Sequence, residues 1–178
     1  MAVAHMHGHG VNAWLKLVSI RACYFAGILI VASQASNDSS IKPRRFKPHE
    51  IANTLPKSSD KVLVDQYMTD TEAASARVFR VYKPLLPHHH NQCDEYLYVL
   101  SGRGTFWMED PKFQQEFGPG ELLYFKKQTV HSLPDILEEP VVFMSLDTPR
   151  RSPDDIHFEN PEHGSPDSWG HDQGSDEL

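Results

Sequence analysis

The chain has 178 residues, and its 17 lysine and arginine side chains against 24 aspartate and glutamate side chains give a formal net charge of −7. No cluster of four or more basic residues occurs, which excludes a polybasic nucleic-acid binder. Hydrophobic residues make up 39% and charged residues 23%, so the chain is not disordered throughout. Two cysteines exclude a disulfide scaffold, and the length suits one domain with a hydrophobic core.

The first 35 residues contain no aspartate or glutamate and have the layout of a secretory signal peptide. Lys16 and Arg21 precede an apolar run over residues 22–32, and Ser33 and Ala35 are small residues at the −3 and −1 positions of a cut. The run is about half the length that a membrane-spanning helix needs. We therefore predict cleavage after Ala35, export to the periplasm or the exterior, and no stable membrane span after processing. The alternatives are a mis-called start codon on a cytoplasmic protein, and an uncleaved anchor.

The segments on either side of the central part differ from it in composition. Residues 36–60 are rich in Ser, Asn, Pro and Lys, and are expected to form a linker or N-terminal arm. Residues 149–178 are rich in Pro, Asp, Glu, Gly and Ser and carry two arginines against eight acidic residues, which predicts an acidic, solvated C-terminal tail. Ile156, Phe158 and Trp169 are the side chains that can fasten parts of this tail to the domain. The last four residues resemble an endoplasmic-reticulum retrieval signal, for which chance is the simpler explanation.

Residues 61–148 contain short runs rich in Val, Tyr, Phe and Leu that are separated by turn residues. We expect a hairpin turn at Ser101–Gly104 and, as the only candidate for helix, a single turn at Thr71–Ala76. Eight short strands with regular turns predict an all-β domain, a sandwich or a barrel. The expected strands are Val62–Tyr67, Arg77–Tyr82, Glu95–Leu100, Thr105–Glu109, Gln114–Phe117, Glu121–Phe125, Val130–Leu133 and Val141–Leu146.

Three consecutive histidines carry the candidate chemistry. Alternate side chains of a strand share one face, so His88 and His90 can point inward together while His89 points outward. Glu95 opens the next strand after a polar turn, and an inward carboxylate beside apolar neighbours costs free energy unless it binds a cation. His131, in a later apolar strand, is the expected fourth ligand. Three neutral imidazoles and one carboxylate suit one divalent transition metal: Fe, Mn, Ni, Cu, Co or Zn.

The same residues form a pattern that resembles the cupin family over roughly residues 60–147. The first cupin motif, His-x-His, four residues, Glu, six residues and Gly, is supplied by His88, His90, Glu95 and Gly102. The second motif keeps its first glycine, Gly120, and its metal histidine, His131, but has Lys126 and Gln128 in place of a proline and a glycine of its turn. The resemblance implies a single jelly-roll β-barrel in which the three histidines and Glu95 hold the metal.

The function that the resemblance implies is broad, because cupins run many chemistries on one fold. The first hypothesis is a metalloenzyme acting on a small oxygen-rich molecule, of the dioxygenase, isomerase or lyase and decarboxylase type. The alternative is a non-catalytic module that binds a small molecule such as a sugar or a carboxylate. A storage role fits less well, since storage relatives usually have two barrels. The resemblance also implies a homodimer, and the sequence assigns no catalytic base and no substrate-binding residue.

Overall fold

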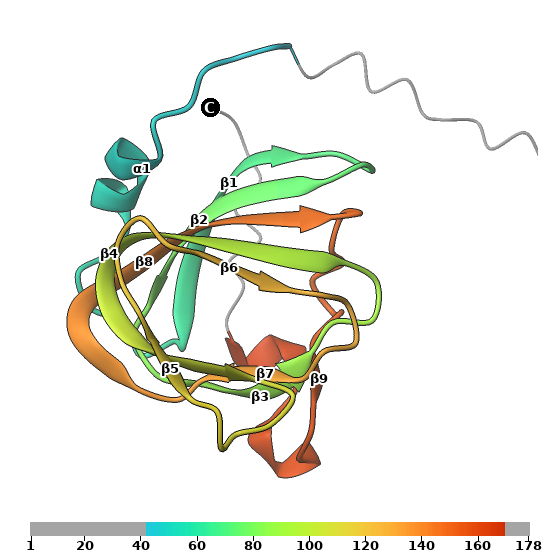
Figure 1. Ribbon diagram of the computed structural model, residues 1–178. Coiled ribbons are helices and arrows are strands. Elements are labelled where there is room, and N and C mark those ends of the chain that lie inside the picture. Colours follow the sequence, from blue (N-terminus) through green and yellow to red (C-terminus); the bar gives the residue numbers. More distant parts are fainter. Residues whose placement is uncertain (1–41, 170–178) are drawn as a thin grey trace, which may run out of the picture. The chain divides into compact units, whose positions relative to one another are not determined.

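The computed structural model describes residues 42–169, so the predicted signal peptide, residues 36–41 and residues 170–178 lie outside the described part (Figure 1). None of the helices in residues 42–169 is long and apolar enough to cross a membrane. The elements are helix α1 (Pro48–Thr54), strands β1 (Leu63–Asp70), β2 (Ser75–Val81), β3 (Leu85–His89), β4 (Asp94–Met108), β5 (Gln115–Phe117), β6 (Leu122–Phe125), β7 (His131–Leu133), β8 (Ile136–Thr148) and β9 (His157–Phe158), and the 3₁₀ helices η1 (Pro161–His163) and η2 (Pro166–Trp169).

The strands form one curled, antiparallel sheet in the order β1-β2-β8-β4-β7-β3-β9, and β5 and β6 also pair with β4. The long strand β4 pairs with β8 along most of its length and with β7 at its end, where Trp107 lies opposite Ser132. It therefore joins the two walls of the barrel (Figure 1). The predicted all-β jelly-roll barrel is confirmed.

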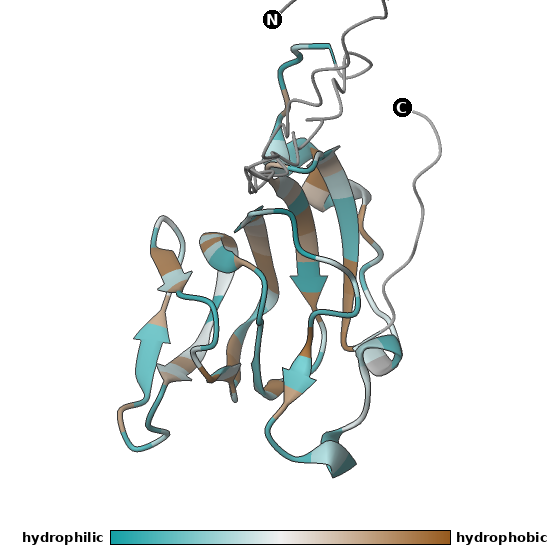
Figure 2. Cartoon of the chain, turned by 90° about the vertical axis from the view of Figure 1, so that its right-hand side faces the viewer, coloured by the Kyte–Doolittle hydropathy of each residue, from teal (hydrophilic) through white to brown (hydrophobic). Residues whose placement is uncertain are grey.

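The hydrophobic core lies between these two walls. Inward-facing side chains alternate with outward-facing ones along the strands, and the rings of Phe79 and Phe143 meet at a centroid distance of 5.3 Å. Figure 2 shows apolar residues concentrated on the strands and hydrophilic residues in the loops. The barrel side chains of the core are Leu63, Phe79, Val81, Leu85, Leu97, Val99, Phe106, Phe117, Leu123, Phe125, Leu133, Val141 and Phe143.

The predicted hairpin turn at Ser101–Gly104 is wrong, because β4 runs through it as one bent strand. Ser101 pairs with Val142 and Arg103 with Glu138, and the register shifts between them. Gly102 has a φ of 78°, and a Cβ there would lie 2.5 Å from the carbonyl oxygen of Pro140. Turn-forming residues at this place therefore make a bulge that bends β4 against β8, instead of reversing the chain.

The helical expectations are also corrected. Thr71–Ala76 is not a helical turn: Thr71 and Ala74 close the hairpin between β1 and β2, and Ser75 begins β2. The described helix α1 lies instead within the segment expected to be a linker, where a proline at its start is compatible with helix geometry. It packs beside β2, since Ala52 is buried and the Nη2 of Arg80 donates to the carbonyl of Ala52 at 3.4 Å.

The first part of the predicted acidic tail packs against the barrel. Arg151, Asp155, Ile156 and Trp169 are each at most 5% exposed. Ile156 and Trp169 belong to the core, and Phe158 packs against it. β9 extends the sheet by pairing with β3. Residues 151–169 therefore belong to the folded domain, although their composition is that of a solvated segment.

Candidate metal centre

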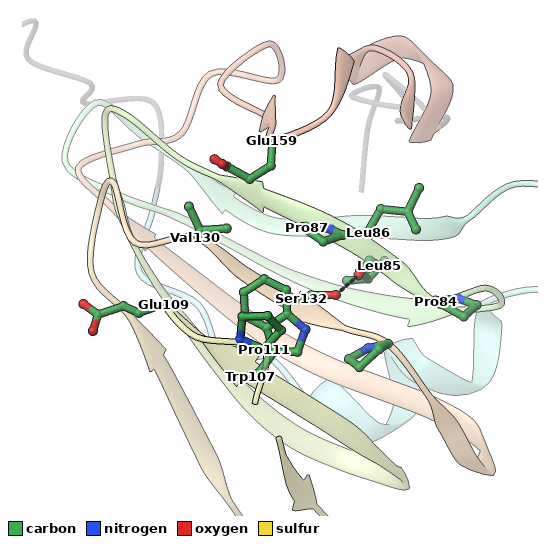
Figure 3. A pocket seen from close by; sticks show the side chains of 11 residues that line it. Pro84, Leu85, Leu86, Pro87, Trp107, Glu109, Pro111, Val130, Ser132 and Glu159 are labelled. Atoms are coloured by element: carbon green, nitrogen blue, oxygen red, sulfur yellow. Dashed lines mark hydrogen bonds between the residues drawn. The ribbon is translucent and has the colours of Figure 1, made fainter. Parts of the chain in front are cut away.

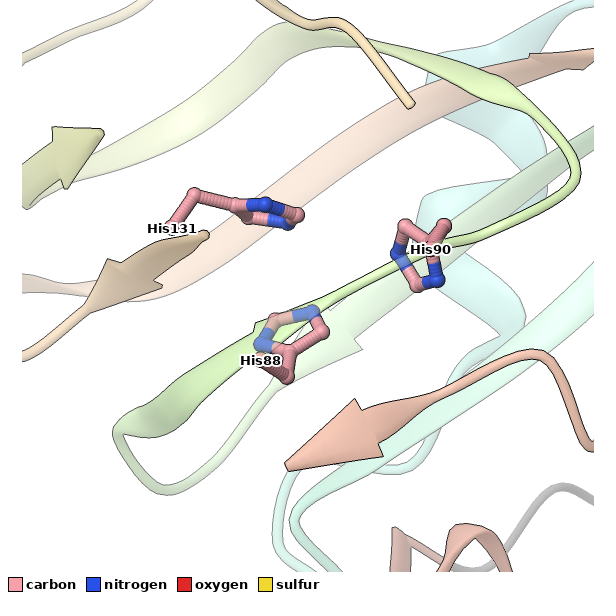
Figure 4. A group of neighbouring side chains, drawn as sticks. All are labelled: His88, His90 and His131. Atoms are coloured by element: carbon pink, nitrogen blue, oxygen red, sulfur yellow. The ribbon is translucent and has the colours of Figure 1, made fainter. Parts of the chain in front are cut away.

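The three predicted histidine ligands come together inside the barrel, and Glu95 lies beside two of them. β3 carries His88 and is followed by His90, β4 carries Glu95, and β7 carries His131. The antiparallel pairing of β3 and β7 puts His88 directly opposite His131. Figure 4 shows the three imidazoles pointing toward one another. One nitrogen of each ring lies within 4.8 Å of the corresponding nitrogens of the other two.

Each imidazole is oriented by a hydrogen bond from its Nδ1 to a backbone carbonyl. The acceptors are Leu86 for His88 at 2.7 Å, Asp155 for His90, and Thr129 for His131 at 2.9 Å. A carbonyl oxygen only accepts, so each Nδ1 carries a hydrogen. Each ring therefore turns its Nε2 toward the centre, which is the orientation found in metal-ligating histidines.

The carboxylate of Glu95 faces the same nitrogens. Its Oε2 lies 3.3 Å from the Nε2 of His131 and 3.6 Å from the Nε2 of His90. Both of these Nε2 atoms are buried and have no hydrogen-bond partner within the described structure. Two nitrogen lone pairs and a carboxylate oxygen at these distances repel one another unless a cation or a proton lies between them. The donor set therefore fits a divalent metal ion.

The protonation states of His88 and Glu95 also fit the binding of a divalent metal ion. Burial, followed by repulsion from His131 and His90, holds the pKa of His88 well below 6.5, so its ring is neutral at pH 7. Burial by itself raises the pKa of Glu95, but hydrogen bonds and positive charge directed at it from His131 and His90 outweigh burial and hold the pKa well below 4.5; a bound metal would take the place of the proton between these groups. Neutral imidazole and ionised carboxylate are the forms that bind metal.

A buried charge network supports Glu95 from the other side. Arg77, on β2, is 3% exposed, and its Nη1 donates to Asp65 at 2.9 Å. Its Nη2 lies 3.7 Å from the Oε1 of Glu95, and its Nε lies 3.8 Å from the Oδ2 of Asp147. Arg77 therefore faces one carboxylate oxygen of Glu95 while the histidines face the other.

This network revises one step of the sequence reasoning. The burial of Glu95 is offset in part by Arg77, so the buried carboxylate does not by itself require a metal. The unpartnered Nε2 atoms of His90 and His131 are the stronger indication. In the sequence, Arg77 is marked only as a basic residue in a mostly apolar strand, and this pattern does not connect it to Glu95.

Aromatic side chains shield the centre. The ring of Phe125 stacks on His131 at a centroid distance of 4.1 Å and an interplanar angle of 10°, and Trp169 meets His88 edge-on at 4.5 Å. The four candidate ligands are between 1% and 5% exposed. The centre therefore lies in a dry environment, where electrostatic interactions are stronger than in water.

The remaining histidine of the triplet and the cysteine in the following turn lie elsewhere. His89 points outward, stacks on His157 at 5.3 Å, and places its Nδ1 3.2 Å from the Oε1 of Glu159. Cys93 is fully buried, and burial raises the pKa of its thiol. A thiol in that state packs as a small apolar side chain.

A groove of about 560 Å³ lies on the outer face of the wall that contains β3 and β7 (Figure 3). Pro87, Val130 and Ser132 line it, and each is adjacent in sequence to a candidate ligand. Successive side chains of a strand point to opposite faces, so this groove and the histidines occupy opposite faces of the same wall. The groove is thus a surface feature separate from the metal centre.

Comparison with known proteins settles the family. Residues 81–147 match the family model of the cupin domain. The matched part of this barrel is a cupin domain. The cupin match includes β3, β4 and β7, and so all four candidate ligands, and it ends before the C-terminal segment. The predicted membership of the cupin superfamily is therefore confirmed.

Solved structures similar to this cupin have the same barrel. A conserved protein with a double-stranded β-helix domain from Klebsiella pneumoniae has a TM-score of 0.51 at 18% identity, covering 61% of this chain and 91% of its own. KdgF from Halomonas sp. has a TM-score of 0.51 at 20% identity, covering 62% and 97%. A candidate mannose-6-phosphate isomerase from Ralstonia eutropha has a TM-score of 0.50 at 15% identity, covering 60% and 98%. At these identities the likeness shows the fold alone. No curated protein matches the chain.

Proposed function

We propose that this cupin binds one divalent transition metal through His88, His90, Glu95 and His131. The observations that carry the proposal are the buried cluster of three imidazoles and the position of one oxygen of Glu95 beside the Nε2 atoms of His90 and His131. These two nitrogens are buried without a hydrogen-bond partner in residues 42–169. A protein rarely leaves such atoms unpaired, and a cation is what their chemistry accepts.

We further propose that the loaded protein is a metalloenzyme acting on a small oxygen-rich molecule. A divalent metal bound here supplies Lewis acidity, which polarises an oxygen atom of the substrate. The chain itself holds the ligand rings in place through backbone carbonyls. Phe125 and Trp169 keep water away from the centre. Arg77 keeps Glu95 turned with one oxygen toward the histidines.

A non-catalytic binding module is the second candidate, and the hydrogen bonds of three side chains that are able to transfer a proton, Tyr82, Tyr124 and Asp135, favour it. The hydroxyl of Tyr82 donates to the carbonyl of Pro56, and Tyr124 donates to Asp94 at 3.2 Å. Asp135 accepts hydrogen bonds in another part of the barrel. Within residues 42–169 these three side chains therefore have partners of their own, and a centre to which they do not contribute a proton suits binding.

Metal content tests the first proposal. Elemental analysis of protein purified without an affinity tag should find one transition metal per chain. Replacing His90 with Ala should lower the metal content far more than His89→Ala, which is the matched control because His89 faces outward. Equal losses in both variants would refute the assigned ligands. A preparation that is free of metal and also refuses added Mn, Fe, Ni, Cu and Zn would refute the site.

Turnover separates the enzyme from the binding module. The metal-loaded protein should be assayed with a panel of diketones, dicarboxylates and sugars. Mannose 6-phosphate belongs in this panel because one solved neighbour is named for an isomerase of that compound. Product formation that is lost in Glu95→Ala supports the enzyme. Saturable binding of a panel member without turnover supports the module.

Two further proposals concern the chain beyond the site. We propose that residues 1–35, which lie outside the described residues, are removed during export, because their sequence is basic, then apolar, then small. We also propose that the protein is a homodimer, as the family resemblance implies. Sedimentation of the purified protein tests the dimer, and a monomer at all concentrations contradicts it.

A further inference from the structure

We propose that the C-terminal segment, residues 151–169, completes the metal centre. It fixes the orientation of His90 through Asp155 and closes the barrel over His88 with Trp169. The segment follows the part of the chain that matches the cupin model, which ends at residue 147. Figure 1 shows its strand β9 next to β3 and β7 at one end of the barrel. This inference rests on the proposed metal site.

Asp155 ties the segment to the turn between β3 and β4. Its Oδ1 accepts the backbone N–H of Asn91 and its Oδ2 that of Gln92, each at 2.9 Å. Its backbone carbonyl accepts the hydrogen bond from the Nδ1 of His90. Asp155 is 1% exposed, so water does not substitute for it. One residue therefore holds both the backbone next to His90 and the ring of His90.

The segment is anchored on either side of Asp155. Arg151 is 2% exposed, and its Nε lies 3.3 Å from the Oδ2 of Asp147 at the end of β8. Ile156 is buried in the core. In β9, Phe158 pairs with His88, which makes the segment an additional strand beside β3. The contact between Asp155 and His90 is thus held by the sheet and the core.

Trp169 closes the centre at the far end of the segment. Its ring meets that of His88 edge-on at 4.5 Å and that of Phe158 at 5.5 Å. Trp169 is 5% exposed and His88 is 2% exposed. The C-terminal segment, and not the barrel alone, therefore shields this ligand from water.

Docking of the segment and binding of metal must then be coupled. The segment contacts His88 and His90 only when it is docked, and coupling between two binding events is reciprocal. Loss of a partner that orients a ligating histidine typically lowers metal affinity about 10- to 100-fold. Asp155→Ala keeps the backbone carbonyl that orients His90 but removes the carboxylate that fixes it to the N–H groups of Asn91 and Gln92, so we expect the lower end of that range, a loss of about tenfold. Trp169→Ala should release bound Zn²⁺ faster than the wild type, because His88 loses the ring that covers it.

Zn²⁺ affinity of the full chain, measured by competition with a chelator, tests the positioning role. Asp154→Ala is the matched control, because Asp154 is the exposed neighbour whose carboxylate accepts only from Ser152 in the described structure. Asp155→Ala should lose about tenfold in affinity while Asp154→Ala stays at the wild-type value. Affinity of Asp155→Ala within twofold of the wild type would overturn the proposal. A wild-type chain that binds no Zn²⁺ would instead overturn the proposed metal site, and the inference with it.

The second measurement uses the wild-type chain, so it does not depend on the folding of a variant. Amide hydrogen exchange across residues 151–169 should slow when Zn²⁺ is added, because metal binding favours the docked segment. The amides of Asn91 and Gln92, which bind Asp155, should slow with it. Exchange in the segment that is unchanged by saturating Zn²⁺ would show that the segment and the centre are independent, and would overturn the proposal.

Discussion

Replacing Arg77 with Met should lower the free energy of unfolding more than a substitution of an exposed arginine does. Arg77 is 3% exposed and faces Asp65 at 2.9 Å, Glu95 at 3.7 Å and Asp147 at 3.8 Å. The variant keeps a side chain of similar length but leaves these carboxylates with one cation fewer. Breaking a buried ion pair by removing one partner costs about 3–5 kcal/mol. We expect the free energy of unfolding to fall by about that amount.

Urea denaturation of the metal-free protein at pH 7, followed by circular dichroism, measures this loss. The matched control is Arg103→Met, which removes an arginine from an ion pair with Glu116 whose side chains are 51% and 60% exposed. Exposed pairs contribute at most about 1 kcal/mol, so the control should change stability little. A loss below about 1 kcal/mol for Arg77→Met, or equal losses in both variants, would refute the view that Arg77 neutralises this cluster.

Three further predictions concern the rest of the chain. The pKa of His88 in the folded protein lies below 6.5, so below that pH the unfolded chain binds a proton that the folded chain does not. The free energy of unfolding of the metal-free protein should therefore fall as the pH drops below about 6.5. A free energy of unfolding that stays constant in urea denaturation from pH 7.5 to 5 would contradict this. In a Cys23→Ser variant, Cys93 should react with a disulfide reagent only after unfolding, and rapid reaction of the folded protein would disprove its burial. N-terminal sequencing of the native protein should begin near Ser36, whereas an intact Met1 on a soluble product would refute export.

The strand pattern and the ligand set were accessible from sequence because they depend on local rules. Alternation along a strand predicted that His88 and His90 face inward and His89 outward, and the structure has this arrangement. The spacing to Glu95 and the apolar surroundings of His131 then placed the other two donors at the same centre. The first of these inferences needs only the direction of a side chain relative to its neighbours, whereas the meeting of His131 with the other three ligands was implied by the resemblance to the cupin motifs.

The bend in β4 could not be predicted in this way. Ser101–Gly104 has the composition of a turn, and only its pairing with β8 shows that the chain continues. That pairing is between residues far apart in the sequence. The left-handed backbone of Gly102 fits a bulge and a turn equally well, so the residue type does not separate the two.

The role of the C-terminal segment was hidden by its average composition. Its many acidic and small residues predict solvation, whereas a few side chains decide its position. Asp155 binds the N–H groups of Asn91 and Gln92, more than 60 positions earlier in the chain. Arg77 and Glu95 likewise belong to different strands. Contacts of this kind appear only when the fold is known.

Anomalous X-ray diffraction from crystals of the metal-loaded protein tests the central claim most directly. We expect a single strong anomalous peak inside the barrel, from a metal ion bound to the Nε2 atoms of His88, His90 and His131 and to the Oε2 of Glu95. A peak at the outer pair formed by His89 and His157, or no peak inside the barrel, would contradict it.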